Sequence, residues 1–282
     1  MGDRRVHPHA GRRNGIAAAL LASMTGVVPA VAAAPSQLPR PALGAHTLLV
    51  QTEGKGATPA VTAALTTQVA GSSLLTLVGG WASNSHPPSD SKDNVWTALG
   101  RAVFRGYHGR FDARAYVSLS ARGGRDHTVS LTKNGDAAGE LSLAFIEIRN
   151  AAVLQDMALN YPVPGRFDRF LARLARPLPN VLQKVLGGSA ALTSGAVTTT
   201  GPATLVAVWW GDAAVYRMTA VPNNGFRVID RFLDLPPNSG VQCAVAGREV
   251  AEAGTYRVTW TGRPAQGAIL WLFAFQPRQR RP

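Results

Sequence analysis

The pair Asp126-His127 is the part of the sequence that comes closest to an acid–base site. A histidine beside an acceptor can act as the general base for a serine, here Ser118 or Ser120. However, the segment HTVSLT around His127 alternates like a strand, and the chain contains no G-x-S-x-G nucleophile elbow. The sequence therefore favours a structural role for His127 and predicts no catalytic residue.

Carboxylates near residue 150 offer a second kind of chemistry, glycoside hydrolysis. Such enzymes hold two carboxylates about 5–10 Å apart. Glu140 and Glu147 are seven residues apart on one predicted strand, a span of roughly 23 Å at ~3.3 Å per residue, so they cannot form this pair. Glu147 with Asp156 stays open.

Metal ligation finds little support in the spacing of the residues. Four histidines, at positions 46, 86, 108 and 127, are scattered without H-E-x-x-H or H-x-H spacing. Asp90, Asp93 and Asn94 crowd one loop, but three oxygens are too few for calcium, so we expect a turn stabilised by these side chains. We predict neither a metal nor another cofactor.

Aromatic and arginine side chains predict a binding surface instead. Aromatic faces stack on sugar rings, and arginine contacts anions. Trp209 and Trp210 are adjacent in a predicted strand and point to opposite faces, so one of them should leave a shared core. It would then be exposed or covered by residues 166–188. The candidate binding residues are Trp209, Trp210 and Trp81, with Arg278, Arg280 and Arg281 of the basic tail.

The first 34 residues predict export. Four arginines precede an apolar run, IAAALLASMTGVVPAVAAA, and Ala30-Val31-Ala32 and Ala32-Ala33-Ala34 both fit the small-x-small cleavage pattern. We predict a cleaved signal peptide at 1–34, with an uncleaved membrane anchor as the alternative. The mature protein would then be secreted, periplasmic or on the cell surface.

The charge of the chain indicates its partners. Lys and Arg number 29 against 16 Asp and Glu, a net charge of +13. Removing residues 1–34 takes away four arginines and one aspartate and leaves +10. We expect attraction to an anionic polysaccharide or envelope surface, and no specific nucleic acid. The single cysteine, Cys243, excludes an intrachain disulfide and should be a buried thiol.

Short alternating segments predict an all-β fold. In ELSLAFIEI (140–148) the residues alternate with the period of a strand. A sheet with one apolar face must pack on another sheet, which makes the sandwich the expected architecture. Two series of predicted strands align in the same order, with Leu74 on Leu205, Val129 on Val258 and Phe145 on Phe273.

We therefore predict two tandem β-sandwich units, immunoglobulin-like or jelly-roll, with a short helical connector. The expected order is a signal peptide (1–34), a linker (35–60), the first unit (61–150), the connector (151–194), the second unit (195–276) and a basic tail (277–282).

The connector has the pattern of a basic amphipathic helix. Its apolar residues have helical spacing, and arginines occupy the other side: Phe167, Phe170, Leu171 and Leu174 against Arg166, Arg169, Arg173 and Arg176. The apolar stripe can dock on the protein's own domain, or segment 166–186 can lie on a membrane surface. The shortness of the stripe favours docking.

Three segments of the first unit share a pattern with a known group of modules. DSKDNVW (90–96), ARGGRDHTVSLT (121–132) and an apolar strand ending at Glu147 resemble secreted bacterial β-sandwich modules, which are immunoglobulin-like or jelly-roll. The resemblance covers residues 60–150 and extends only weakly to 195–276. Asp93 stands where the pattern has glycine. The resemblance implies fold class and location, and no catalytic residues.

Together these observations predict an exported, non-catalytic protein. It would bind an envelope or extracellular polymer, such as an anionic glycan, through an arginine-rich and aromatic surface. One alternative is a secreted hydrolase that uses His127 with a nearby serine or carboxylate. The other is a structural surface protein whose units pack edge to edge.

Overall fold

A computed structural model describes residues 39–277, except for 53, 82–85, 106–108, 176, 180–181, 183–185, 213–217, 237–238 and 240–241. The predicted signal peptide and the three tail arginines lie outside the described residues. Leu38–Pro282 form one compact unit. Its described elements are eighteen antiparallel strands and one helix, α1, so the all-β prediction is confirmed.

The first half of the chain forms a five-stranded and a three-stranded sheet. The larger sheet has the order β1 (Ala42–Gln51), β8 (Leu141–Arg149), β3 (Ser72–Trp81), β6 (Phe111–Ala121), β5 (Thr97–Val103). The smaller sheet has the order β2 (Ala60–Val61), β7 (Val129–Leu131), β4 (Ser89–Asp90).

The second half forms an equivalent pair of sheets and a short ribbon. The larger sheet has the order β14 (Arg227–Phe232), β15 (Gln242–Val250), β12 (Ala203–Gly211), β18 (Ala268–Gln276), β9 (Val153–Asn160). The smaller sheet has the order β10 (Ala190–Thr193), β17 (Thr259–Arg263), β13 (Thr219–Pro222). The ribbon pairs β11 (Val197–Thr199) with β16 (Gly254–Tyr256).

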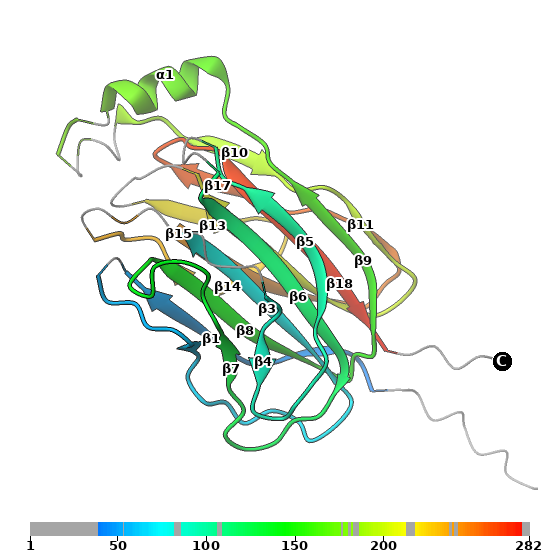
Figure 1. Ribbon diagram of the computed structural model, residues 1–282. Helices are drawn as coiled ribbons and strands as arrows, with labels where there is room; N and C mark the ends of the chain where they lie inside the picture. Colours follow the sequence, from blue (N-terminus) through cyan, green and yellow to red (C-terminus); the bar gives the residue numbers. More distant parts are fainter. Residues whose placement is uncertain are drawn as a thin grey trace, which may run out of the picture. The chain divides into compact units, whose positions relative to one another are not determined.

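The strand orders of the two halves correspond position by position. When the second large sheet is taken in reverse, β9, β18, β12, β15 and β14 stand where β1, β8, β3, β6 and β5 stand in the first. The long strands of both sheets lie along roughly the same axis, with neighbouring strands antiparallel (Figure 1). The pairs aligned from the sequence, β3 with β12, β7 with β17 and β8 with β18, occupy equivalent positions.

The sheets stack in four layers around three cores. One core lies between the first half's two sheets, and a second lies between the second half's two sheets. The third core joins the two five-stranded sheets, with Leu75 and Ile146 of the first half beside Trp210 and Phe273 of the second. The prediction of two separate tandem units is therefore not confirmed, because both halves build this central core.

Two segments expected to lack strands contain long ones. The predicted linker, 35–60, contains β1, and the predicted connector, 151–194, contains β9. Each forms an edge of a five-stranded sheet, and most of their residues are half-buried. A half-buried edge strand lacks the strong alternation that marks a strand in sequence, which is why the residue pattern did not predict them.

Each edge strand of the two large sheets carries an irregularity in its pairing. The register shifts at Leu43/His46 in β1, at Ala98/Gly100 in β5, at Val228/Asp230 in β14, and opposite Ala274/Phe275 in β9. Of the inner pairs, β3–β8, β12–β15 and β12–β18 have continuous registers, and β3–β6 shifts only at Ser72/Leu74. An irregularity of this kind bends an edge strand and leaves a residue unpaired.

Helix α1 (Arg166–Ala175) corresponds to the predicted amphipathic segment. The apolar stripe was predicted to dock on the protein, and this is wrong for three of its residues. Phe167, Phe170 and Leu174 are exposed. The helix rests on the protein through smaller side chains, with Ala175 buried and Ala172 against the outer core of the second half. Among the described residues, no helix has the length and apolar character to cross a membrane.

Candidate functional site

His127 lies in a buried hydrogen-bond network between β4 and β7. Its imidazole is fully buried, with Nε2 3.2 Å from Asp90 Oδ1 and Nδ1 2.8 Å from Thr67 Oγ1. Since Thr67 Oγ1 accepts the Gly124 N–H at 3.1 Å, its own proton can point to Nδ1, and Nε2–H then donates to Asp90. Both ring nitrogens are engaged within the protein.

Asp90 is the centre of this network. Its Oδ2 accepts the Trp96 indole N–H at 2.7 Å, and its Oδ1 accepts the Lys92 backbone N–H at 2.8 Å and the Asn94 side-chain amide at 3.1 Å. Burial by itself raises the pKa of Asp90, but the hydrogen bonds from His127, Lys92 and Trp96 outweigh it and hold the pKa below its usual value. The loop 90–96 is thus a turn stabilised by its aspartate, as predicted.

Thr67, His127 and Asp90 have the residue types of a catalytic triad, but a substrate cannot reach the histidine. A general base must reach a proton on the substrate, whereas the His127 side chain is 0% exposed. The network instead ties loop 90–96 to the segment just before β7, where His127 forms a bridge to Leu65. Asp90 of the DSKDNVW segment and His127 are hydrogen-bonded to each other, which is a physical reason for the two to occur together in the sequence pattern.

Diethyl pyrocarbonate should distinguish a buried from a reachable histidine. We expect the reagent to modify His46, whose side chain is 30% exposed, and to leave His127 unmodified in the folded protein. Mass spectrometry of peptides would measure both sites, and unfolding in urea should make both reactive. Modification of His127 at a rate similar to that of His46 would contradict its burial and would restore the hydrolase alternative.

Glu147 is likewise a buried structural carboxylate. Its Oε1 accepts the Gln68 backbone N–H at 2.6 Å and the Ser72 hydroxyl at 2.7 Å. Its Oε2 accepts the Ala45 backbone N–H, in the irregular part of β1, at 3.1 Å and Arg149 Nε at 3.3 Å. A carboxylate with a 0% exposed side chain and four donors cannot approach a sugar, which removes the glycosidase pair left open by the sequence.

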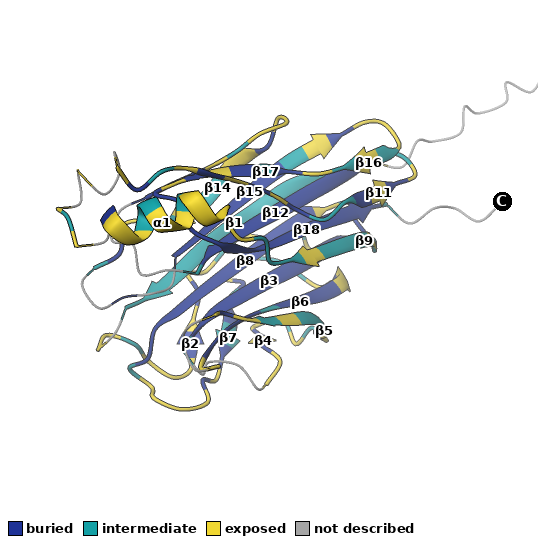
Figure 2. Cartoon of the chain, turned by 90° about the horizontal axis from the view of Figure 1, so that it is seen from above, coloured by how far each residue is buried: buried dark blue, intermediate teal, exposed yellow. Residues whose placement is uncertain are grey.

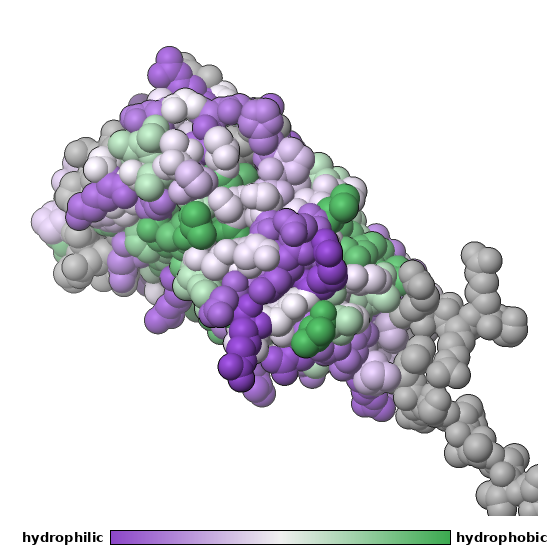
Figure 3. Space-filling view, turned by 60° about the horizontal axis from the view of Figure 1, so that its bottom comes forward, coloured by the Kyte–Doolittle hydropathy of each residue, from purple (hydrophilic) through white to green (hydrophobic). Residues whose placement is uncertain are grey.

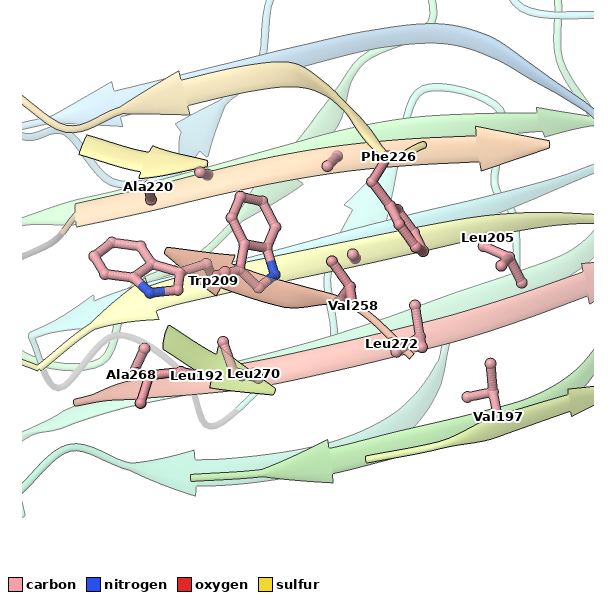
Figure 4. Close-up of a cluster of buried hydrophobic side chains, with 14 of the residues drawn as sticks. Leu192, Val197, Leu205, Trp209, Ala220, Phe226, Val258, Ala268, Leu270 and Leu272 are labelled. Atoms are coloured by element: carbon pink, nitrogen blue, oxygen red, sulfur yellow. The ribbon is translucent and has the colours of Figure 1, made fainter. Parts of the chain in front are cut away.

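The tryptophans proposed as binding residues are mostly buried. Trp209 is 1% and Trp210 0% exposed, because β12 has a core on each face. Figure 4 shows Trp209 among the side chains of the outer core of the second half. Trp81 is half-buried, packs edge-to-face on Phe111 and has the Arg110 guanidinium 5.4 Å from its ring centre.

Of the two outcomes predicted for positions 209 and 210, exposure is therefore wrong, and Trp209 is covered mainly by the outer core of the second half. Two adjacent strand residues can both be buried when a sheet is the inner layer of a stack. On the face shown in Figure 3, hydrophobic residues form small separate clusters among hydrophilic ones. Cys243 is buried as expected, and burial raises the pKa of its thiol to about 12.

An open groove of about 460 Å³ lies at the seam between the two halves. We call it the seam groove. Leu43 of β1 forms one wall, and the residues around β14 and β15 form the other: Gly225, Arg227, Ile229, Gly247, Arg248 and Glu249. Hydrogen bonds hold the seam together, from the Leu43 N–H to Glu249 Oε1 at 3.0 Å and from His46 Nδ1 to Asp230 Oδ2 at 2.9 Å.

Two guanidinium groups give the seam groove its chemical character. Arg227 is exposed, and the half-buried Arg248 lies 5.9 Å from the ring centre of Phe226 and 5.4 Å from that of Tyr256. Gly225 adopts φ +75°, and a Cβ there would be 3.6 Å from Arg248 Nε. The turn therefore brings the backbone close to a guanidinium that is flanked by two aromatic rings.

A second open groove lies between β13 and β14, with a volume of about 480 Å³. Its charged lining residues, Arg231 and Asp234, are of opposite sign. The seam groove has two arginines against Glu249, whose Oε1 already accepts a hydrogen bond. The seam groove is therefore the more positive of the two and the better candidate for an anion.

The sequence did not predict the residues of the seam groove. Asn224-Gly225 is a typical turn sequence, and it forms a turn here, with Asn224 at φ +55° and the Phe226 N–H bonded to the Asn223 carbonyl. The partner strand β1 lies in the predicted linker, so nothing in the sequence placed Leu43 beside this turn.

A scan of family models finds no match for the chain, and searches of curated proteins and of solved structures find none either. The resemblance to secreted β-sandwich modules therefore depends on the residues quoted above and on the β fold. Within the described residues, no cluster of three or more His, Cys, Asp or Glu side chains could hold a metal ion.

Proposed function

We propose that the chain is an exported, non-catalytic protein that binds an anionic polymer, such as an acidic glycan of the cell envelope or its surroundings, in the seam groove. The observation that carries the proposal is the pair Arg227 and Arg248 in one open groove, with Arg248 flanked by Phe226 and Tyr256. Phe226 is buried and Tyr256 is half-buried, so these rings support Arg248 and do not replace the tryptophans as exposed stacking faces.

Charge and shape both support a polymer as ligand. Without residues 1–34 the chain has a net charge of +10, which attracts anionic surfaces over distances of about a Debye length. Guanidinium groups bind carboxylate and sulfate-like oxygens through paired N–H donors. A groove that is open to solvent can admit a continuous chain of sugars, whereas an enclosed pocket would admit only a small molecule.

Retention on beads of an anionic polysaccharide tests this function. We expect Arg227→Ala with Arg248→Ala to lower the affinity at least about tenfold, because two charge-assisted contacts are lost. Arg248→Lys should also weaken binding, since lysine keeps the charge but loses the planar donor fork. Binding at several salt concentrations would separate the groove's contribution from general attraction.

The matched control removes two exposed arginines elsewhere, Arg125→Ala with Arg263→Ala. This variant has the same net charge as the groove variant and should keep most of its affinity. If both double variants lose affinity equally, and all binding disappears at high salt, net charge alone explains retention and the seam groove is not the site.

A further inference from the structure

Helix α1 presents large apolar side chains to solvent. Phe167 is 70%, Phe170 56% and Leu174 57% exposed. At 100° per residue, these positions lie within about 60° of one another around the helix axis. Figure 2 shows much of α1 in the colour of exposed residues. These three side chains are called the outer apolar face below.

The outer apolar face is turned away from the protein because another face of α1 holds the helix in place. Ala175 is buried, and Ala172 packs on the outer core of the second half. Asp168 lies on this inner side, with its Oδ1 about 3.8 Å from the position of a Cβ on Gly188. Small side chains allow the close approach, and the larger apolar ones remain free for another contact.

Arginines flank the outer apolar face. Arg166, Arg169 and Arg173 are all exposed. On the helical wheel the three lie about 40–100° from Phe170, on the side opposite Leu171. The only acidic residue of α1, Asp168, lies on the inner side, so the outward part of the helix is apolar and basic. Exposed apolar residues continue beyond it at Leu182 and Leu186.

We propose that α1 binds in the surface of an anionic phospholipid bilayer. The outer apolar face would enter the boundary between headgroups and acyl chains, and Arg166 and Arg173 would contact lipid phosphates. An apolar face bordered by basic residues is the arrangement that holds a helix in this interface. The inference uses none of the residues of the seam groove and is independent of the polymer-binding proposal.

Charge complementarity selects a bilayer over a second copy of the chain. A two-fold symmetric contact through the outer apolar face would bring each copy's arginines into the same interface. The single aspartate of α1 lies on the inner side and would not neutralise them. Like charges in a contact oppose association, whereas an anionic bilayer supplies both acyl chains and phosphates.

Vesicle binding by the predicted mature chain, residues 35–282, tests this inference, with hydrogen–deuterium exchange of residues 166–175 as the local readout. Vesicles of phosphatidylcholine with phosphatidylglycerol should bind the protein and slow exchange in α1, and phosphatidylcholine alone should bind it weakly. Phe167→Ser with Phe170→Ser should reduce binding at least about tenfold and abolish the local protection. Arg166→Gln with Arg173→Gln should reduce binding to anionic vesicles only.

The control replaces two exposed valines on other elements, Val95→Ser with Val221→Ser, which are 83% and 58% exposed. It should bind vesicles like the unmodified protein, and the phenylalanine variant should keep its affinity for the anionic polysaccharide. Unchanged vesicle binding and protection in the phenylalanine variant would overturn the inference. Self-association that the phenylalanine substitutions abolish, without vesicle binding, would overturn it in favour of a second copy.

Discussion

Trp210→Ala should lower the free energy of unfolding by about 3–5 kcal/mol and should destabilise both halves of the chain. Trp210 belongs to β12 in the second half and is fully buried in the central core. Removing a buried indole loses its transfer free energy and leaves a cavity. Its ring lies against Gly79 of β3, in the first half, so the loss should reach that half. Urea unfolding and amide exchange in β3 would measure both effects.

A double-mutant cycle makes this expectation specific. A Cβ at Gly79 would overlap with the Trp210 ring, so Gly79→Ala should cost about 1–3 kcal/mol in the unmodified chain. In the Trp210→Ala background the same substitution should cost much less, because the ring is gone. Val221→Ala, at an exposed site in the second half, is the control. If the two substitutions have additive effects on the free energy of unfolding, or if amide exchange in β3 is unchanged, the halves are stable separately.

Asp90→Asn should lower the free energy of unfolding at pH 7 by about 2–4 kcal/mol. Oδ1 and Oδ2 of Asp90 both accept hydrogen bonds, and Oδ2 accepts the Trp96 indole N–H. An asparagine with its oxygen at the Oδ1 position directs an NH₂ group at that indole, and two buried donors then face each other. Asp93→Asn is the matched control, because Asp93 is exposed in the same turn.

The pH dependence of stability should change as well. The folded pKa of Asp90 lies below its ordinary value, so its contribution is fully present above the unfolded pKa of about 4 and is lost as the pH falls through the folded value. Asp90→Asn should therefore lose more stability at pH 7 than at pH 3, while Asp93→Asn loses little at either. Equal losses at both pH values would contradict the ionised Asp90 inside the network.

The sequence predicted the class of the fold because its inner strands have strong patterns. The segments of β3, β7, β8, β12 and β18 are rich in buried apolar residues, and they were found and correctly paired between the halves. The edge strands β1 and β9 are mostly half-buried and were assigned to a linker and a connector. A strand's place in a sheet depends on distant partners, which the local pattern does not contain.

The candidate site was less predictable than the fold for the same reason. The burial of both Trp209 and Trp210 follows from a third and fourth layer, and adjacent strand residues cannot reveal how many layers cover a sheet. Conversely, Phe167 and Phe170 do not dock on the protein as predicted, because small alanines on a neighbouring face of α1 make the contact between the helix and the protein. The amphipathic pattern identified the helix but not which side of it meets the protein.

The register shifts in the four edge strands affect how this protein behaves at high concentration. An open sheet edge is a template on which another chain can add a strand, and continued addition leads to fibrils. Here every edge of the two large sheets is irregular, while three inner pairings are continuous. The sheet edges of this protein should therefore resist growth into amyloid even where its local concentration is high.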